Sequence, residues 1–207
     1  MTRLVVATTN PGKVREINGI LVGVAQNIAL VSLEQFPEIV EPEETGQTFA
    51  ENARLKALYY SRATGLPAVA DDSGLEIDAL DNAPGVHSAR WFGTDYSVKF
   101  RKIYELGGAG SGARFVCHVA LADGDRIEYE TTGIVEGTIA PEPRGTNGFG
   151  YDPIFFYPPF GCTLAELDLE RKATVSHRGQ AFGALCDYLT RGSGLGIRGS
   201  GSGARDS

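Results

Sequence analysis

RLVVATTNPGKVREINGIL, residues 3–21, sets the fold class of the chain. Its first part, residues 3–9, is an apolar run rich in residues that favour strands. The second part, residues 11–21, repeats apolar side chains at the spacing of one helical face, namely Val14, Ile17, Ile20 and Leu21. The stretch therefore predicts a strand, a tight turn and a helix, an arrangement that is typical of α/β proteins.

The rest of the chain continues this alternation. A capping box of Thr48 and Glu51 begins a second helix, which Gly65 can end. Short buried strands are predicted at residues 66–70 and 75–80, with a polar turn, Asp71–Gly74, between them. Further elements are a helix over 97–106, a hairpin of strands 114–121 and 126–135, a strand over 154–157 and a last helix over 176–189. The pattern predicts an α/β fold with a mixed sheet.

Length and composition indicate one domain. The chain has 207 residues, 42% of them hydrophobic, which suits one substantial core rather than two. We expect a single domain over residues 1–191 and a disordered Gly- and Ser-rich tail over residues 192–207. The tail contains GxGxxG at Gly194, Gly196 and Gly199, but no strand precedes it and no helix follows, so we assign it no nucleotide site.

Charge and hydropathy exclude several classes of protein. The formal net charge of -7 argues against broad binding to nucleic acid or anionic membranes, because such binding needs a surplus of Lys and Arg. No apolar run approaches the roughly 20 residues of a membrane span, and the first residues enter a strand pattern, so a cytoplasmic location is expected. Three cysteines lack zinc-site spacing and are interpreted as reduced structural thiols: Cys117, Cys162 and Cys186.

The turn TTNPGK, residues 8–13, is a candidate phosphate site. A helix N-terminus offers unpaired N–H groups and a partial positive charge to an anion. Asn10 can cap the helix, Gly12 lets a ligand approach, and Lys13 adds a mobile positive charge. The alternative is an ordinary capped helix with a solvated lysine.

The acidic pair Asp71 and Asp72, followed by Ser73, is a candidate magnesium site at a strand end. Adjacent strand residues point to opposite faces, so only one of the two carboxylates can enter a site there unless the chain has turned. The acidic segment 38–46 can supply a second ligand. The alternatives are a plain polar turn for the pair and a solvated loop for the segment.

The segment GTNGFGYDP, residues 145–153, is a candidate nucleobase site. Phe149 and Tyr151 offer flat faces, and a ring stacked on a base contributes roughly 1 to 3 kcal/mol in single-stranded nucleic-acid sites. An aromatic-anchored turn is the alternative.

Cationic side chains before and at the start of the last predicted helix are candidates for base recognition. Lys172, His177 and Arg178 can donate to the 6-keto oxygen of hypoxanthine, xanthine or guanine, whereas the 6-amino group of adenine would set a donor against donors. Surface capping of the helix is the alternative.

Taken in order, ATTNPGK, ADDSGL with APGVHSAR, GFGYDPIF and SHRGQA closely resemble the inosine triphosphate pyrophosphatase family, the non-canonical purine nucleoside triphosphate pyrophosphatases. The resemblance covers about residues 3–190. It implies Mg²⁺-dependent hydrolysis of such a triphosphate to monophosphate and pyrophosphate, by a homodimer whose elongated α/β subunit has a cleft between two lobes. Asn147 departs from the family, in which a second glycine is commoner at that position.

The resemblance also implies roles for individual residues. Asp72 would be the catalytic carboxylate, as metal ligand or as base, with Asp71 in support, and Glu44 would be a second metal ligand. Substrate binding is implied for Thr8, Thr9, Asn10, Pro11, Gly12, Lys13, Ser73, Phe149, Gly150, Tyr151, Asp152, Lys172, His177 and Arg178. The preferred substrate among inosine, deoxyinosine and xanthosine triphosphates stays open.

Two other functions fit parts of the sequence. A septum-formation-inhibitor-type nucleotide pyrophosphatase shares the early T-x-N-x-x-basic turn but prefers pyrimidine or modified nucleotides, and the SHRGQ and GFGYDP segments argue against it. A sensor that binds the triphosphate without cutting it would lack the metal-site acid, whereas Asp72 is present.

Overall fold

The computed structural model describes residues 2–21 and 28–191. Its strands are β1 (Thr2–Val6), β2 (Ile28–Ser32), β3 (Ala68–Ile77), β4 (Gly112–Asp123), β5 (Arg126–Ile139), β6 (Phe155–Tyr157) and β7 (Cys162–Thr163). Its α-helices are α1 (Pro11–Leu21), α2 (Phe49–Thr64), α3 (Tyr96–Glu105), α4 (Leu169–Val175) and α5 (His177–Thr190). None of these helices is both long enough and apolar enough to cross a membrane.

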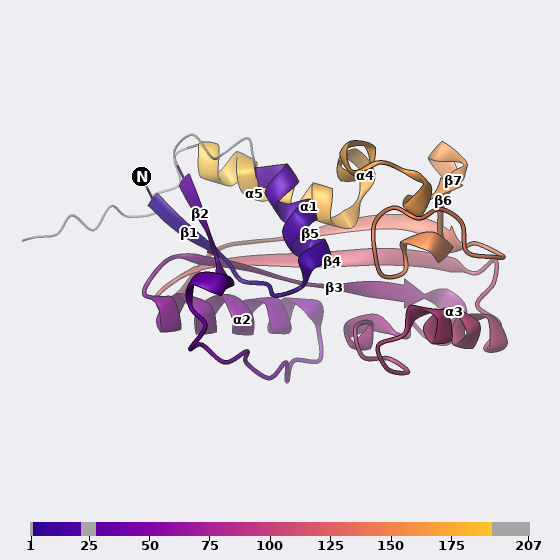
Figure 1. Ribbon diagram of the computed structural model, residues 1–207, viewed down its shortest axis with the longest axis horizontal. Helices are drawn as coiled ribbons and strands as arrows, with labels where there is room; N and C mark the ends of the chain where they lie inside the picture. The colour runs from indigo at the N-terminus through magenta and orange to yellow at the C-terminus, as the bar shows by residue number, and fades with distance from the viewer. Residues whose placement is uncertain (1, 22–27, 192–207) are drawn as a thin grey trace, which may run out of the picture.

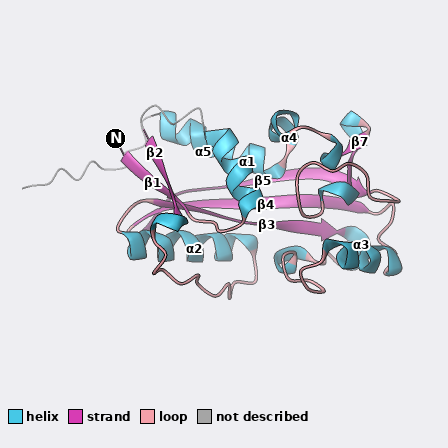
Figure 2. Cartoon of the chain, viewed as in Figure 1, coloured by secondary structure: helices cyan, strands magenta, loops and turns pink. Residues whose placement is uncertain are grey.

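One mixed sheet runs the length of an elongated molecule (Figure 1). The strand order is β2-β1-β3-β4-β5-β6-β7, in which β1 pairs in parallel with β2 and β3 and the later pairs are antiparallel. Helices α1, α4 and α5 lie on one face, and α2 and α3 lie on the other (Figure 2). The predicted α/β fold with a mixed sheet is confirmed.

Local signals read from the sequence account for many element boundaries. Helix α1 has the predicted bounds, and Asn10 caps it by accepting from the N–H groups of Gly12 and Lys13. The capping box begins α2, and Gly65 ends it with a φ of 67°. The long hairpin of β4 and β5 is also confirmed.

Other expectations were wrong or fall outside the described residues. No turn forms at Asp71–Gly74, because β3 continues through these residues and β4 pairs with every one of them. The first strand ends at Val6 rather than at residue 9, and the seven-residue helix α4 was not predicted. The predicted tail, residues 192–207, lies outside the part of the chain that the structure describes.

Strand β1 covers only part of one edge of β3. Strand β1 pairs with β3 only at Ala68 and Val69, whereas β3 continues to Ile77. Beyond Val69 the start of α1 approaches this edge, since the ammonium of Lys13 lies 2.9 Å from a carboxylate oxygen of Asp71. The side chains of Asp71 and Asp72 therefore lie beside the part of this edge that β1 leaves unpaired, on opposite faces of the sheet.

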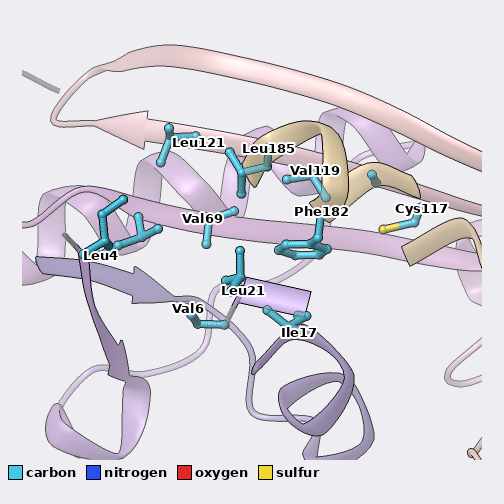
Figure 3. Packing of buried hydrophobic residues seen from close by; sticks show 12 residues of the cluster. Leu4, Val6, Ile17, Leu21, Val69, Cys117, Val119, Leu121, Phe182 and Leu185 are labelled. Atoms are coloured by element: carbon cyan, nitrogen blue, oxygen red, sulfur yellow. The ribbon is translucent and has the colours of Figure 1, made fainter. Parts of the chain in front are cut away.

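The core beneath α1 and α5 holds these helices in place (Figure 3). Phe182 of α5 is 1% exposed and packs in one cluster with Ile17 of α1 and with Val69 and Val119 of the sheet. On the opposite face, small side chains allow α2 to pack closely against the sheet. They form an alanine-rich cluster of Ala53, Ala57, Ala68, Ala70 and Ala120. Alternation along β3 thus directs Asp71 toward α1 and α5, and Asp72 toward α2.

Phe182→Ala should lower the free energy of unfolding by about 3 to 5 kcal/mol, because it leaves a large cavity in this core. Denaturant unfolding followed by circular dichroism measures the change. Phe160→Ala is the control, since Phe160 is 40% exposed and its loss should cost little. Equal effects of the two substitutions would contradict the assignment of Phe182 to the core.

Candidate functional site

Segments far apart in the sequence meet in one pocket beside the open edge of β3. It is lined by Asn10, Lys13, Ser73, Gly74, Ser88, Ala89, Tyr96, Phe115, Phe149, Gly150, Tyr151, Asp152, Lys172, His177 and Arg178. All four candidate motifs contribute to this lining. The wall combines cationic groups with aromatic rings, a composition that suits an anionic ligand with a flat ring system.

A buried carboxylate, Glu16 of α1, holds two of the cations. Its oxygens lie 2.6 Å from Nζ of Lys172 and 2.5 Å from Nη1 of Arg178. Lys172 also pairs with Asp152. Burial opposes ionisation of Glu16, but Arg178 and Lys172 outweigh burial and lower its pKa. Helices α1, α4 and α5 are thus joined through charge at the pocket.

Asp71 anchors the cations from the other side. Its Oδ2 lies 2.9 Å from Nζ of Lys13 and 3.6 Å from Nε of Arg178, and it accepts from the hydroxyl of Ser73 at 3.0 Å. Arg178 in turn donates to the Ser73 oxygen at 2.8 Å. Burial alone would raise the pKa of Asp71, but Lys13 and Arg178 hold it well below its usual range. Asp71 therefore positions cations as an ionised carboxylate.

Aromatic side chains surround these charges. The ring of His177 stacks on Phe115, with centroids 4.6 Å apart and an interplanar angle of 12°. Burial, with Arg178 and Lys172 nearby, lowers the pKa of His177 well below its usual value, which favours the neutral imidazole. Its buried Nδ1 has no hydrogen-bond partner among the described residues.

The ring of Phe149 lies against the start of α1. A Cβ on Gly12 would come within 2.6 Å of this ring, so glycine allows the close contact. Lys172 Nζ and the guanidinium carbon of Arg178 lie 5.2 and 5.4 Å from its centroid. These distances suit cation–π contacts, which fix the ring beside the cations.

Asp72 belongs to a second polar cluster, on the α2 face of β3. It accepts from Nδ2 of Asn52 at 3.2 Å and from Nζ of Lys56 at 3.3 Å, and the same ammonium donates to Glu44 at 2.6 Å. Burial raises the pKa of Asp72, and Lys56 and Lys13 offset this only in part. Two carboxylates therefore converge on one lysine beside the pocket.

Glu44 and Asp72 are the residues beside the pocket that could hold a magnesium ion together with a phosphorylated ligand. Mg²⁺ commonly takes one or two protein carboxylates and completes its shell with water and substrate phosphates. Within the described residues no group of three or more His, Cys, Asp or Glu could hold a metal by itself. Glu44 and Asp72 would thus form an incomplete metal site, which the ligand would complete.

Only some of the residues that were proposed for substrate binding from the sequence line this pocket. The pocket includes Asn10, Lys13, Ser73, Phe149, Gly150, Tyr151, Asp152, Lys172, His177 and Arg178. Thr8, Thr9 and Pro11 instead line a separate cavity together with the segment after β2, and Gly12 packs on Phe149. His177 and Arg178 are each 3% exposed. Because both side chains are buried, capping of a helix at the protein surface does not account for them.

Several residues of the site were missed from the sequence. Glu16 has the spacing of a solvated helix residue, so nothing local marks it as buried. Asn52 and Lys56 lie four residues apart and interrupt the alanine-rich face of α2, which is a signal that could have revealed them. Phe115 and Tyr96 lie in ordinary apolar patterns and enter the pocket only through tertiary structure.

Known proteins share both the sequence and this fold. The model of the Ham1 family matches residues 4–188. The dITP/XTP pyrophosphatase of Geobacter sulfurreducens is 50% identical over 195 residues, which cover 91% of this chain and 97% of that protein. The dITP/XTP pyrophosphatase of Thermus thermophilus is 49% identical over 198 residues, covering 92% and 93%.

Solved structures agree with these relatives. The structure of a HAM1 protein from Coxiella burnetii superposes with a TM-score of 0.82 at 40% identity, covering 93% of this chain and all of that chain. The Staphylococcus aureus Ham1 protein gives a TM-score of 0.81 at 35% identity, covering 92% and 99%. Since the family match spans nearly the whole described chain and sequence and fold agree, the chain belongs to the Ham1 family.

Proposed function

We propose that this protein hydrolyses non-canonical purine nucleoside triphosphates, of the inosine, deoxyinosine and xanthosine kind, to the monophosphate and pyrophosphate. The observation that carries the proposal is the single pocket that joins aromatic rings, buried cations and a neighbouring carboxylate pair. The relatives named dITP/XTP pyrophosphatase support the same reaction. Removal of these triphosphates from the nucleotide pool follows from that reaction.

Base recognition is assigned to α4 and α5. Lys172 and Arg178 carry N–H donors, and the neutral His177 has a buried nitrogen without a partner among the described residues. Donors at this wall match a 6-keto oxygen, whereas the amino group of adenine would face them unpaired. Phe149 supplies an adjacent ring that the base can contact.

Phosphate binding is assigned to Lys13 and the capped start of α1, with Lys56 on the opposite side. Glu44 and Asp72 would hold Mg²⁺ together with the phosphates. The bound ion would offset charge that develops on the pyrophosphate leaving group.

Asp72 orients a water toward the α phosphorus and accepts its proton as the P–O bond to pyrophosphate breaks. A carboxylate with a raised pKa suits this proton transfer.

The homodimer that the resemblance implies and the cytoplasmic location that the sequence predicts also stay proposals. Analytical ultracentrifugation would test the first, and fractionation of cells that express the protein would test the second.

Purified protein should release pyrophosphate faster from inosine and xanthosine triphosphates than from adenosine, guanosine and cytidine triphosphates. Release should depend on Mg²⁺ and stop with a chelator. A coupled pyrophosphate assay measures both. Binding without release would favour the sensor, and a preference for cytidine triphosphate would favour the septum-formation-inhibitor type.

Asp72→Asn should lower kcat at least about a hundredfold while the protein stays folded, because the amide can neither accept the proton nor hold the metal as a carboxylate does. Steady-state kinetics and circular dichroism test the two halves of this statement. Asp78→Asn is the matched control, since the Asp78 side chain is 61% exposed. Wild-type turnover in Asp72→Asn would remove Asp72 from the reaction.

Lys13→Ala should raise KM for inosine triphosphate by about tenfold or more, because one charge-assisted contact to phosphate is lost. The Asp71 carboxylate keeps one cationic partner in this variant, since Nε of Arg178 remains 3.6 Å from its Oδ2. Lys102→Ala, on a distant exposed lysine, controls for the change of net charge. Unchanged kinetics in Lys13→Ala would contradict the phosphate assignment.

A further inference from the structure

Asn52 of α2 is a buried, neutral side chain that contacts Asp72. It is 0% exposed and lies four residues, about one helical turn, before Lys56. Residues at this spacing share one face of a helix, and both of these side chains donate to Asp72, at 3.2 and 3.3 Å. The proposed reaction gives Lys56 a role in phosphate binding but leaves Asn52 without one.

The amide of Asn52 also holds the backbone of Gly46, two residues after Glu44. Its Oδ1 accepts from the Gly46 N–H at 2.8 Å, and its Nδ2 donates to the Gly46 carbonyl oxygen at 3.4 Å. A Cβ on Gly46 would come within 2.6 Å of Asn52 Oδ1, so glycine allows this close approach. The N–H groups of the next two residues bond to Glu51. The end of the acidic segment is therefore fastened to the first turn of α2.

These contacts define one orientation of the Asn52 amide. An amide has an acceptor oxygen and two N–H donors, whereas an ionised carboxylate only accepts. The oxygen meets the N–H of Gly46, and the donors meet the Gly46 carbonyl and Asp72. The reverse orientation would set the amide oxygen against the Asp72 carboxylate. Asn52 thus connects the segment that carries Glu44 directly to Asp72 without adding a charge.

Asn52 and Lys56 together fix both oxygens of Asp72. Oδ2 accepts from Asn52 and Oδ1 accepts from Lys56, although the last torsion of an aspartate side chain is otherwise broad. The same ammonium donates to Glu44 at 2.6 Å. A divalent cation beside the two carboxylates would repel this ammonium, but it would repel a neutral amide far less. The bonds of Asn52 are therefore the ones that can persist when a metal ion is bound.

We propose that Asn52 is a positioning residue for the metal: it holds the Asp72 carboxylate in one orientation and keeps Glu44 beside it, so that the two can bind Mg²⁺ together. This inference rests on the proposed function. Hydrogen bonds that orient metal ligands commonly contribute about 10- to 100-fold to metal affinity or activity. The alternative is that Asn52 only stabilises the start of α2. Its loss would then lower stability and leave the dependence on Mg²⁺ unchanged.

Asn52→Ala removes all three side-chain bonds. The Mg²⁺ concentration that gives half-maximal pyrophosphate release from inosine triphosphate should rise about tenfold or more. KM for the triphosphate at saturating Mg²⁺ should stay near the wild-type value, because the cations of the pocket are kept.

Metal binding can also be measured without turnover. The probe is Mn²⁺, followed by electron paramagnetic resonance, with an inosine triphosphate analogue that carries a methylene group between its α and β phosphorus atoms. The Kd of Mn²⁺ for the complex of protein and analogue should rise about tenfold or more in Asn52→Ala.

Ser61→Ala is the matched control on the same helix. Ser61 is 1% exposed, and its hydroxyl joins the Leu66 carbonyl to the N–H of Gly124. It lies nine residues, roughly 13 Å, along α2 from Asn52. Its loss should lower stability and keep the wild-type dependence on Mg²⁺.

Gly46→Ala is a second test, which keeps every polar side chain. The added methyl group would press on Asn52 Oδ1 and separate the acidic segment from it. The dependence on Mg²⁺ and the Kd of Mn²⁺ should shift in the same direction as in Asn52→Ala. This variant also serves if Asn52→Ala is insoluble.

The two proposals fail separately. A wild-type protein without metal-dependent cleavage of inosine triphosphate would refute the proposed function. A wild-type protein with that activity, together with wild-type Mg²⁺ and Mn²⁺ dependence in the soluble variants at positions 46 and 52, would refute the assignment of Asn52 alone. An equal shift in Ser61→Ala would also refute it, because it would indicate a general loosening of α2. Weaker binding of Mn²⁺ in the variants at positions 46 and 52, but not in Ser61→Ala, would support the assignment.

Discussion

The carboxylate of Glu16 lies buried between the ammonium of Lys172 and the guanidinium of Arg178, and it ties α1 to α4 and α5. Each of these charges would be unfavourable alone, since removing one partner of a buried ion pair commonly costs about 3 to 5 kcal/mol. The three side chains therefore depend on one another. Because Phe149 lies beside both cations and against α1, the aromatic part of the pocket depends on the same interaction.

The early end of β1 explains how one pocket can use both faces of a sheet. In a fully paired sheet, Asp71 and Asp72 would be separated by a continuous layer of backbone. Here β1 stops beside Val69, so the two carboxylates flank an open edge. Asp71 holds cations on the α1 and α5 side, and Asp72 meets Lys56 and Glu44 on the α2 side. A triphosphate at this edge could contact the pocket and the Glu44–Asp72 pair at once.

Sequence patterns predicted the parts of this arrangement that depend on local chemistry. The cap at Asn10, the capping box of α2 and the left-handed Gly65 need only neighbouring residues, and all three are present. Asp71–Gly74 looked like a turn because Asp, Ser and Gly favour turns, but pairing with β4 overrides that preference. Glu16 could not be predicted as a site residue, because its partners lie more than 150 positions away.

An acidic protein can bind a polyanion because charge acts locally. The formal net charge is -7, yet the pocket and its rim hold Lys13, Lys56, Lys172 and Arg178 in buried or half-buried positions. The carboxylates beside these cations do more than cancel them, since they fix each cation in place before the ligand arrives. Interactions in such a preorganised, partly dehydrated site are screened less by salt than those of exposed lysines.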